Sequence, residues 1–350
     1  MSIATIKSEV EHLTLSLVLT SKLRQQAKIR STHYSTRIEG NRLTLAEATQ
    51  VVKQGKITFR GRERDVREVR NYWNALLKVE QWARERRIIS EKLLRDLHAL
   101  VEIGPRARPT PYRDGQNVIS DAVSGAIVYL PPEAKDVPDL MAGLVKWIKE
   151  AERANIPMPL IAGLAHYQFV TIHPYFDGNG RTARLLATFI LQRGGFGLNG
   201  YYSLEEHHAR DLSGYYQALA VHPHHNYYEG RAQADLTLWL EYFIAKLADT
   251  FAAVKTEANR LTQHGVSTIP KGLQKLDQRA KVVISLFVDA DHITTSEVAQ
   301  VLGLSERMAR LLLADWVNAG WLVIVEASRR KRNYKLSAKY RKFIGKPSAK

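Results

Sequence analysis

The sequence contains no cysteine, which excludes disulfides, thiolate nucleophiles and cysteine-based zinc sites. It also lacks long apolar runs: none approaches the roughly 18 residues that span a bilayer, and the short stretch 13–19 follows Glu9 and Glu11, unlike a signal peptide. Low-complexity tracts and internal repeats of about 20 to 50 residues are absent as well. Together these absences predict a globular cytoplasmic protein that makes no use of a membrane.

Acidic residues are scarce at both ends of the chain, whose formal net charge is +16. Residues 1–80 hold 15 Lys and Arg against 8 Asp and Glu, and residues 270–350 hold 16 against 7, whereas residues 81–269 hold 20 of each. Attraction to a polyanion is therefore expected of the two ends rather than of the neutral middle. A basic surface without a polyanionic partner is the alternative.

Strand-like alternation is rare in the first 270 residues, where apolar residues recur at helical spacing, as at Val69, Tyr72, Trp73 and Leu76. The exception is 117–130, which predicts a short β-hairpin between helices. A chain of 350 residues favours more than one domain. We expect an N-terminal helical region at 1–85, a catalytic core at 86–268, a C-terminal domain at 269–340 and a basic tail at 341–350.

The C-terminal domain has the pattern of a winged helix-turn-helix. A capping box from Thr294 to Glu297 opens its second helix, and Ser305 caps a third that stops at Gly320. Two strands follow, joined by a basic tip. Such a domain binds DNA or, alternatively, a protein. The candidates for contacts with DNA phosphates are Arg307, Arg310, Arg329, Arg330, Lys331 and Arg332.

The most informative segment is HPYFDGNGRTAR at residues 173–184, which an apolar helix follows. Pro174 ends the preceding helix and leaves His173 at its end. Gly178 and Gly180 let successive backbone N–H groups converge at the start of the next helix, where the helix dipole favours an anion. The segment therefore predicts a phosphate-binding turn.

The side chains of this turn have the chemistry of phosphoryl transfer. Asp177 offers an oxygen ligand to Mg²⁺, which keeps waters and substrate phosphates as its other ligands. Arg181 and Arg184 share a face of a helix and can clamp a polyphosphate. His173 can take a proton from an attacking hydroxyl near neutral pH. The segment thus combines a base, a metal ligand, an anion hole and a cationic clamp.

The string resembles the signature of the Fic family, H-P-F-x-[D/E]-G-N-G-R-x-x-R, with Tyr175 in place of the usual Phe. Segments 162–169 and 68–72 also resemble family helices. The resemblance implies a mainly α fold, with a Fic helical core and a β-hairpin flap ahead of the winged helix. It implies that a Ser, Thr or Tyr hydroxyl of a protein, or of the chain itself, attacks the α-phosphate of ATP and receives AMP.

The resemblance also implies roles around ATP and its Mg²⁺. Doc-type kinases, which transfer phosphate, have lysine at the position of Gly180, so AMP transfer is favoured. Relatives that move other nucleotide-derived groups or remove AMP are further alternatives. The implied residues are His173 as the catalytic base, Asp177 as the Mg²⁺ ligand, and Gly178, Asn179, Gly180, Arg181 and Arg184 around the phosphates. Tyr216, next to Tyr215, is implied near adenine, and Asn226 is the candidate for a contact with the adenine base.

Two further segments match family features. The predicted hairpin lies where the family has its flap, which binds a target segment by added β-pairing. Val128 and Tyr129 are the candidates for this contact, and a role in covering the core is the alternative. Upstream, STRIEG at residues 35–40 resembles the family's inhibitory motif. Ser35 and Glu39 are spaced to face one partner on a helix. The family pairs this glutamate with the second arginine, here Arg184, and ATP then binds unproductively.

Histidines occur in two clusters, 205–208 with its glutamates and 222–225, whose spacing fits no known zinc site and indicates solvated loops. His166 is expected in the core. Two functions compete: an adenylyltransferase restrained by Glu39, or a DNA-binding transcription regulator that senses nucleotide or modifies only itself. DNA binding would appear as a gel shift that weakens as salt rises. The sequence leaves the target and the oligomeric state open, a homodimer included.

Overall fold

The computed structural model describes residues 3–11, 17–54, 57–105, 107–120, 124–221, 225–229, 234–263, 276–284, 286–302, 304–327 and 332–342. Helices predominate in these residues, and the strands form two small antiparallel sheets. The predicted mainly α fold is therefore confirmed. No helix within the described ranges has the length and apolar character needed to cross a membrane.

The chain divides into two compact units. The first comprises residues 1–11 and 26–255, and the second comprises residues 12–25 and 256–350. The domain boundaries expected at residues 85, 268 and 340 are not tested by this division into units and stay predictions.

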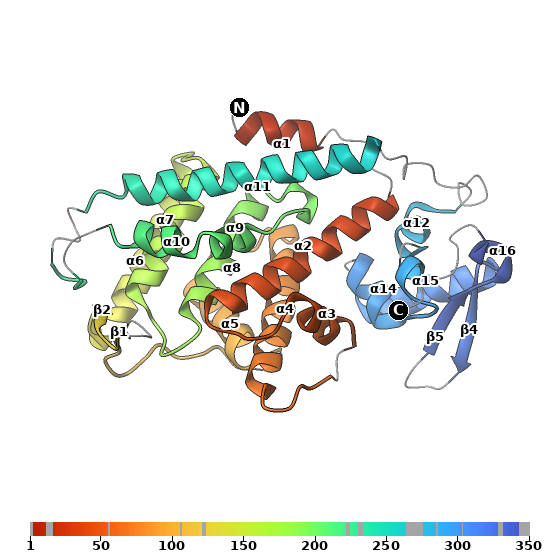
Figure 1. The fold of residues 1–350 in the computed structure, drawn as a ribbon, viewed down its shortest axis with the longest axis horizontal. Helices are drawn as coiled ribbons and strands as arrows, with labels where there is room; N and C mark the ends of the chain where they lie inside the picture. Colours follow the sequence, from red (N-terminus) through yellow and green to blue (C-terminus); the bar gives the residue numbers. More distant parts are fainter. Residues whose placement is uncertain are drawn as a thin grey trace. The chain divides into compact units, whose positions relative to one another are not determined.

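Most helices lie in the first unit (Figure 1). Two of them, α2 and α11, continue past its limits. The elements are α1 (Ile3–Glu11), α2 (Leu17–Ile38), α3 (Leu45–Gln54), α4 (Glu63–Arg84), α5 (Glu91–Glu102), β1 (Ile119–Ser120), β2 (Ile127–Tyr129), η1 (Ala134–Asp136), α6 (Val137–Arg153), α7 (Met158–Ile172), α8 (Asn179–Arg193), η2 (Leu198–Gly200), α9 (Leu204–Arg210), α10 (Leu212–Leu219) and α11 (Thr237–Gln263).

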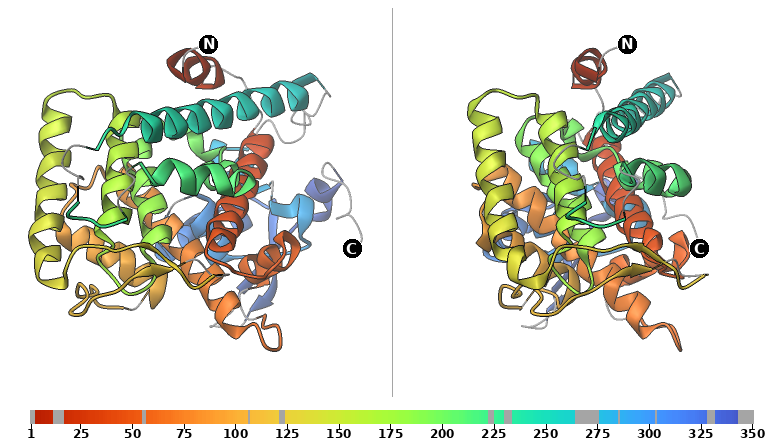
Figure 2. Two further views of the ribbon diagram at one scale, coloured as in Figure 1. Left: turned by 60° about the vertical axis from the view of Figure 1, so that its left-hand side comes forward. Right: turned by 90° about the vertical axis from the view of Figure 1, so that its left-hand side faces the viewer.

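Helix α8 forms the centre of this unit. Nearly all of its residues are buried, including the polar Asn179, Arg181 and Arg184 at its start. Helices α4, α5 and α7 pack around it, and α7 lies alongside it in both views of Figure 2. Its second half, residues 185–191, is apolar on nearly every side, and such a helix is expected to be buried. The residues of the HPYFDGNGRTAR segment at the start of α8 are therefore surrounded by packed helices.

The predicted hairpin at 117–130 is confirmed, although its strands are short. β1 and β2 pair antiparallel, with Ile119 opposite Tyr129. Between them Gly125 has a left-handed backbone (φ 70°), which suits a turn and favours glycine. Beyond β2, Leu130 forms an isolated parallel bridge with Asn226.

The second unit contains a small helical bundle and a three-stranded sheet. The predicted capping box is present: the Thr294 hydroxyl accepts from the Glu297 N–H (3.2 Å), and the Glu297 carboxylate accepts from the Thr294 N–H (2.6 Å). Ser305 caps the next helix, as expected. The elements are α12 (Gln278–Ile284), α13 (Leu286–Asp289), β3 (Ile293–Thr294), α14 (Thr295–Leu302), α15 (Glu306–Asn318), β4 (Leu322–Ala327), β5 (Arg332–Leu336) and α16 (Ala338–Arg341).

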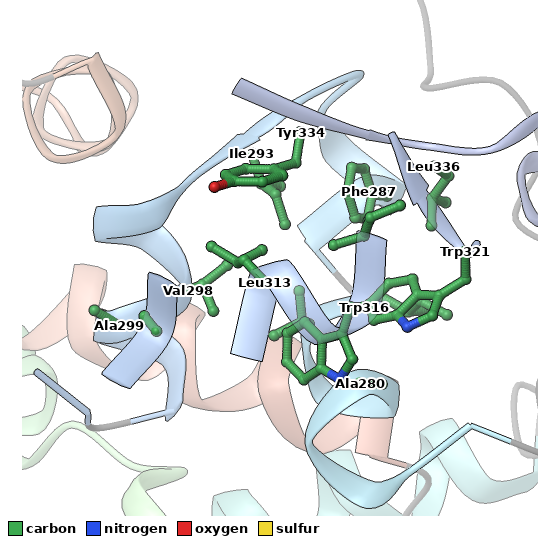
Figure 3. Close-up of a cluster of buried hydrophobic side chains, with 14 residues drawn as sticks. Ala280, Phe287, Ile293, Val298, Ala299, Leu313, Trp316, Trp321, Tyr334 and Leu336 are labelled. Atoms are coloured by element: carbon green, nitrogen blue, oxygen red, sulfur yellow. The ribbon is translucent and has the colours of Figure 1, made fainter. Parts of the chain in front are cut away.

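Aromatic and aliphatic side chains of these helices and strands form a separate core (Figure 3). The rings of Trp316 and Trp321 lie 5.1 Å apart there, and the Trp316 indole donates to Asp277 Oδ2 (2.9 Å). The sheet has the order β3-β5-β4, so β3, which the sequence pattern did not predict, is its third strand. A two-residue strand is too short to show alternation. That this unit is a winged helix-turn-helix stays a prediction.

The predicted DNA contacts are only partly within the described residues. Arg307 and Arg310 are exposed on α15, where Arg310 also pairs with Glu306 (2.9 Å), and Arg332 is exposed at the start of β5. Arg329, Arg330 and Lys331 lie outside the described residues. DNA binding by this unit stays a prediction.

Candidate active site

The predicted phosphate-binding turn joins α7 to α8. His173 ends α7 with a left-handed backbone (φ 52°, ψ 58°), and its N–H donates to Phe169 O (3.0 Å). Gly178 is left-handed too (φ 77°), and a β-carbon there would lie 2.6 Å from Glu102 Oε1, so this position requires glycine. The first N–H groups of α8 have no partner within the helix and carry the positive end of its dipole. The turn can therefore bind an anion.

Two side chains hold the turn in shape. Asn179 is buried, and its amide accepts from Tyr175 N–H (3.0 Å) and donates to Tyr175 O (2.7 Å). His98 stacks on the Tyr175 ring (3.5 Å between centroids), and its Nε2–H donates to Asp177 O (2.8 Å). Both polar atoms of the Asn179 side chain thus bond to the backbone of Tyr175 and fix the shape of the turn. Tyr175 keeps the aromatic contact expected when it replaces phenylalanine.

The hydrogen bonds of His173 determine its tautomer. Its Nδ1 lies 3.1 Å from Val170 O, and a carbonyl can only accept, so Nδ1 carries the proton. Nε2 is then left as a proton acceptor. Burial lowers the pKa of His173, and the bond to Val170 and the charge of Glu39 oppose this shift. The imidazole is therefore neutral at neutral pH, as a general base must be.

Asp177 and Arg181 form an ionic cluster beside the turn. Asp177 is exposed, and its Oδ1 accepts from Gly178 N–H (2.6 Å) and from Arg181 (3.1 Å). The buried Arg181 also pairs with Glu102 (2.7 Å). Burial raises the pKa of Glu102, while Arg181 lowers it. Nothing in the local sequence around Glu102 or His98 indicates their place at the site, since both are single polar residues on the amphipathic helix α5.

Arg184 contacts the predicted inhibitory motif. Its Nε donates to Ser35 Oγ (2.8 Å), and its Nη2 donates to Ser35 O (2.8 Å) and to Glu39 Oε1 (2.9 Å). A β-carbon on Gly180 would collide with the same Glu39 oxygen. The Glu39 carboxylate therefore lies against the anion-binding turn. Arg181 and Arg184 have separate partners, and a clamp of the two arginines around a polyphosphate stays a prediction.

A buried carboxylate anchors α2 behind Arg184. Glu205 accepts from Ser31 Oγ (2.8 Å), from the Tyr72 hydroxyl (3.0 Å) and from Ser203 Oγ (3.2 Å). The expectation of a solvated loop at 205–208 is thus wrong, because Glu205, Glu206 and His208 are buried on α9. Because the segment has few apolar residues, its sequence did not indicate a buried helix. The buried carboxylate of Glu205 is instead compensated by hydrogen bonds within the fold. Within the described residues no cluster of three or more acidic residues and histidines could hold a metal.

The residues expected near adenine lie around α10. Tyr215 is buried, and its hydroxyl is 2.8 Å from Nε2 of the buried His166, which agrees with a core position for this histidine. Tyr216 is exposed, and its hydroxyl donates to Ile38 O (3.3 Å), the residue before Glu39. Asn226 pairs with Glu229 (3.3 Å). Residues 222–224 lie outside the described residues.

The flap candidates face different ways. Val128 is exposed on β2, together with its neighbour Ile127, and is free to meet another chain. Tyr129 is half-buried, and its hydroxyl donates to Thr171 O (2.7 Å). Tyr129 therefore fastens the hairpin to the end of α7.

The fold and this site define a mainly helical domain with an anion-binding turn and a neutral histidine beside it. Residues 88–191 match the model of the Fic/DOC family. The resemblance to the Fic family is thus confirmed for residues 88–191.

The chain is similar to "Protein adenylyltransferase fic-1" of Caenorhabditis elegans, with 28% identity over 197 residues. The matched part covers 56% of this chain and only 37% of that protein. A Fic-domain signalling protein from Bacteroides thetaiotaomicron shares the fold, with a TM-score of 0.65 and 23% identity over 74% of this chain and 97% of that one. A Fic family protein from Desulfovibrio desulfuricans matches 96% of this chain and 95% of its own, with a TM-score of 0.58 and 26% identity.

The buried His166 makes stability depend on pH. Burial, and then the charge of Arg184, lower its pKa to about 3. An unfolded histidine takes up a proton near pH 6.5, so the free energy of unfolding falls as the pH drops from about 6.5 toward about 3. At pH 5, His166→Gln should reduce the slope of this free energy against pH by about 1.4 kcal/mol per pH unit. Urea denaturation at several pH values measures the slope.

The exposed His225 supplies a matched control, since His225→Gln removes an imidazole without removing a buried group. An unchanged slope in His166→Gln would mean that His166 does not contribute this dependence.

Proposed function

We propose that this chain is a protein adenylyltransferase that transfers AMP from ATP to a Ser, Thr or Tyr hydroxyl of a protein, the chain itself included. The observation that carries the proposal is the neutral His173, with Nε2 left to accept, beside an anion-binding turn. The name of the C. elegans relative supports the same reaction. We place the reaction in the cytoplasm.

In the proposed reaction the target hydroxyl attacks the α-phosphorus of ATP. A bond forms between the target oxygen and the α-phosphorus, the bond from that phosphorus to the oxygen bridging to the β-phosphate breaks, and pyrophosphate leaves. Nε2 of His173 takes the hydroxyl proton, because Nδ1 is already committed to Val170 O. Charge on the phosphates is met by the N–H groups of Gly178 to Gly180 and by Arg181 and Arg184. Tyr216 lies near adenine.

Gly180 favours AMP transfer over phosphate transfer. In relatives that transfer phosphate a lysine stands at this position and the nucleotide lies reversed. Here even a β-carbon on Gly180 would meet Glu39 and approach Arg184 Nη1 to 3.1 Å. A long cationic side chain therefore has no room while Glu39 is in place.

Asp177 is the residue that would hold Mg²⁺. Its carboxylate is exposed at the edge of the anion-binding turn, and Mg²⁺ in nucleotide sites takes one or two carboxylates with phosphates and water. The residues present therefore fit the ion. When bound, it would neutralise phosphate charge.

Glu39 is proposed to act as a built-in inhibitor. Its ion pair with Arg184 occupies the guanidinium that would otherwise meet the γ-phosphate, and its negative charge repels that phosphate. ATP then binds with its phosphates misplaced. Ser35 strengthens the arrangement by holding the other edge of the same guanidinium.

Glu39→Gly should raise incorporation of AMP by about 5- to 150-fold, the range of a coupling free energy of about 1–3 kcal/mol. Adding His173→Ala to that variant should abolish incorporation, because the base is gone. Transfer from α-labelled ATP to cell-lysate proteins and to the chain itself measures both effects. Glu63→Gly, at an exposed glutamate at the start of α4, is the matched control and should behave like the parent. Equal labelling by the parent and Glu39→Gly would exclude the inhibitory role.

Removal of Mg²⁺ should stop transfer by the Glu39→Gly protein. Chelation with EDTA leaves the phosphate charge unneutralised, and Asp177→Asn should raise the Mg²⁺ concentration needed for half-maximal labelling. Readdition of Mg²⁺ after EDTA is the control, since it must restore labelling. Labelling that persists in EDTA would remove Asp177 from the role of metal ligand.

A further inference from the structure

Three side chains of the hairpin and of the residues just before it donate to the backbone of the turn that carries His173. We call residues 113–120 and 124–132 the flap segment. The Tyr129 hydroxyl donates to Thr171 O (2.7 Å), Arg113 Nε to His173 O (3.0 Å), and Asn117 Nδ2 to Tyr175 O (3.1 Å). The three acceptors are alternate carbonyls along the turn. These three bonds fix the position of the flap segment along the turn, much as a ladder of hydrogen bonds fixes the register of two strands.

Arg113 makes the largest number of these contacts. Its guanidinium also donates from Nη1 to Gly115 O (2.9 Å) and from Nη2 to Pro132 O, and its backbone N–H donates to Pro174 O (2.9 Å). Gly115 precedes the hairpin and Pro132 follows it. One planar, rigid group thus joins both ends of the flap to His173.

The surroundings of Arg113 are unusual for a cation. Its side chain is buried, burial lowers its pKa, and within the described part of the chain it forms no ion pair. Among the described residues, the acceptors of its side-chain hydrogen bonds are the carbonyl oxygens of His173, Gly115 and Pro132. Burying a charge without a counter-ion costs free energy, so a neutral residue would serve better if filling space were the only task.

The flap has few other supports. Its strands contain two and three residues, and isolated two-stranded ribbons are marginally stable even when they are longer. Ile127 and Val128 are exposed, so burial of apolar surface does not hold β2 in place. Leu130, directly after β2, is bonded through its backbone to His225 and Tyr227, and the side-chain bonds to the turn are what connect the flap to His173.

We propose that Arg113 is a positioning residue that holds the flap at a fixed distance from His173, so that a protein segment paired with the flap presents its hydroxyl to Nε2. This inference rests on the proposed AMP transfer. Arg113 does not belong to the turn that binds phosphates, and its bonds end on carbonyls of the flap and of His173 and Pro174. Its loss should therefore affect the acceptor protein and spare the nucleotide.

The test compares variants in the Glu39→Gly protein. Arg113→Lys keeps the charge but cannot reach three carbonyls in one plane. Labelling of lysate proteins should fall by about 10- to 100-fold, the cost of a misplacement of about 1 Å, and the lysate concentration for half-maximal labelling should rise. The dissociation constant of ATP, measured by calorimetry, should stay at the value of Glu39→Gly. Tyr129→Phe removes a different bond to the turn and should cause a smaller loss in the same direction.

Arg95→Lys is the matched control. Arg95 is a half-buried arginine whose Nε donates to Thr110 O (2.8 Å), a carbonyl that belongs to neither the hairpin nor the turn. It should label lysate proteins as Glu39→Gly does.

Unchanged labelling by Arg113→Lys would overturn the inference and leave AMP transfer standing. A parallel loss of ATP affinity and labelling would also overturn it, since it would mean a role in the fold. If folded Glu39→Gly labels no protein and His173→Ala changes nothing, the proposed function itself fails, and the inference with it.

Discussion

The position of the Arg184 guanidinium is the constraint on which the rest of the site depends. It is buried at the start of the central helix, one turn beyond the anion-binding backbone, so its charge needs a partner from outside α8. In this structure the partner is Glu39, with Ser35 on the adjacent edge. A triphosphate could replace that partner, because its γ-phosphate offers the same negative charge. Competition between a carboxylate and a phosphate for one buried cation is the simplest physical basis for regulation here.

That competition requires α2 to be held in place, and the buried polar contacts do this. Ser31 and Tyr72 bind the Glu205 carboxylate, while Asn41 donates to Glu68 Oε2 (2.9 Å) just beyond the inhibitory motif. Each buried carboxylate has hydrogen-bond donors, so its burial is tolerated. Arg113 connects the end of the flap at Pro132 with His173. In the proposed function, one set of contacts governs the binding of the nucleotide, and another governs the approach of the acceptor protein.

The turn could be predicted from the sequence because its determinants are local. His173 ends a helix, Pro174 follows it directly, and Gly178 takes a left-handed backbone, all within a few residues. The inhibitory contact could be predicted only through the resemblance to a family. Residues such as Glu102 and Arg113 could not be predicted, since each is a single polar residue whose role comes from segments some 20 to 80 positions away. The burial of α9 was not predicted for the same reason. Its polar residues suggest exposure, and their hydrogen-bond partners come from distant segments that only the fold brings close.

Titration calorimetry with ATP and ADP tests most directly whether Glu39 withholds Arg184 from the γ-phosphate. In the parent protein the two nucleotides should bind equally well in the presence of Mg²⁺, because no free guanidinium meets the third phosphate. In Glu39→Gly, ATP should bind about 10- to 150-fold more tightly than ADP, as expected for a charged hydrogen bond of about 1.5–3 kcal/mol. The same ratio of ATP to ADP affinity in both proteins would contradict the central role of the Arg184–Glu39 pair.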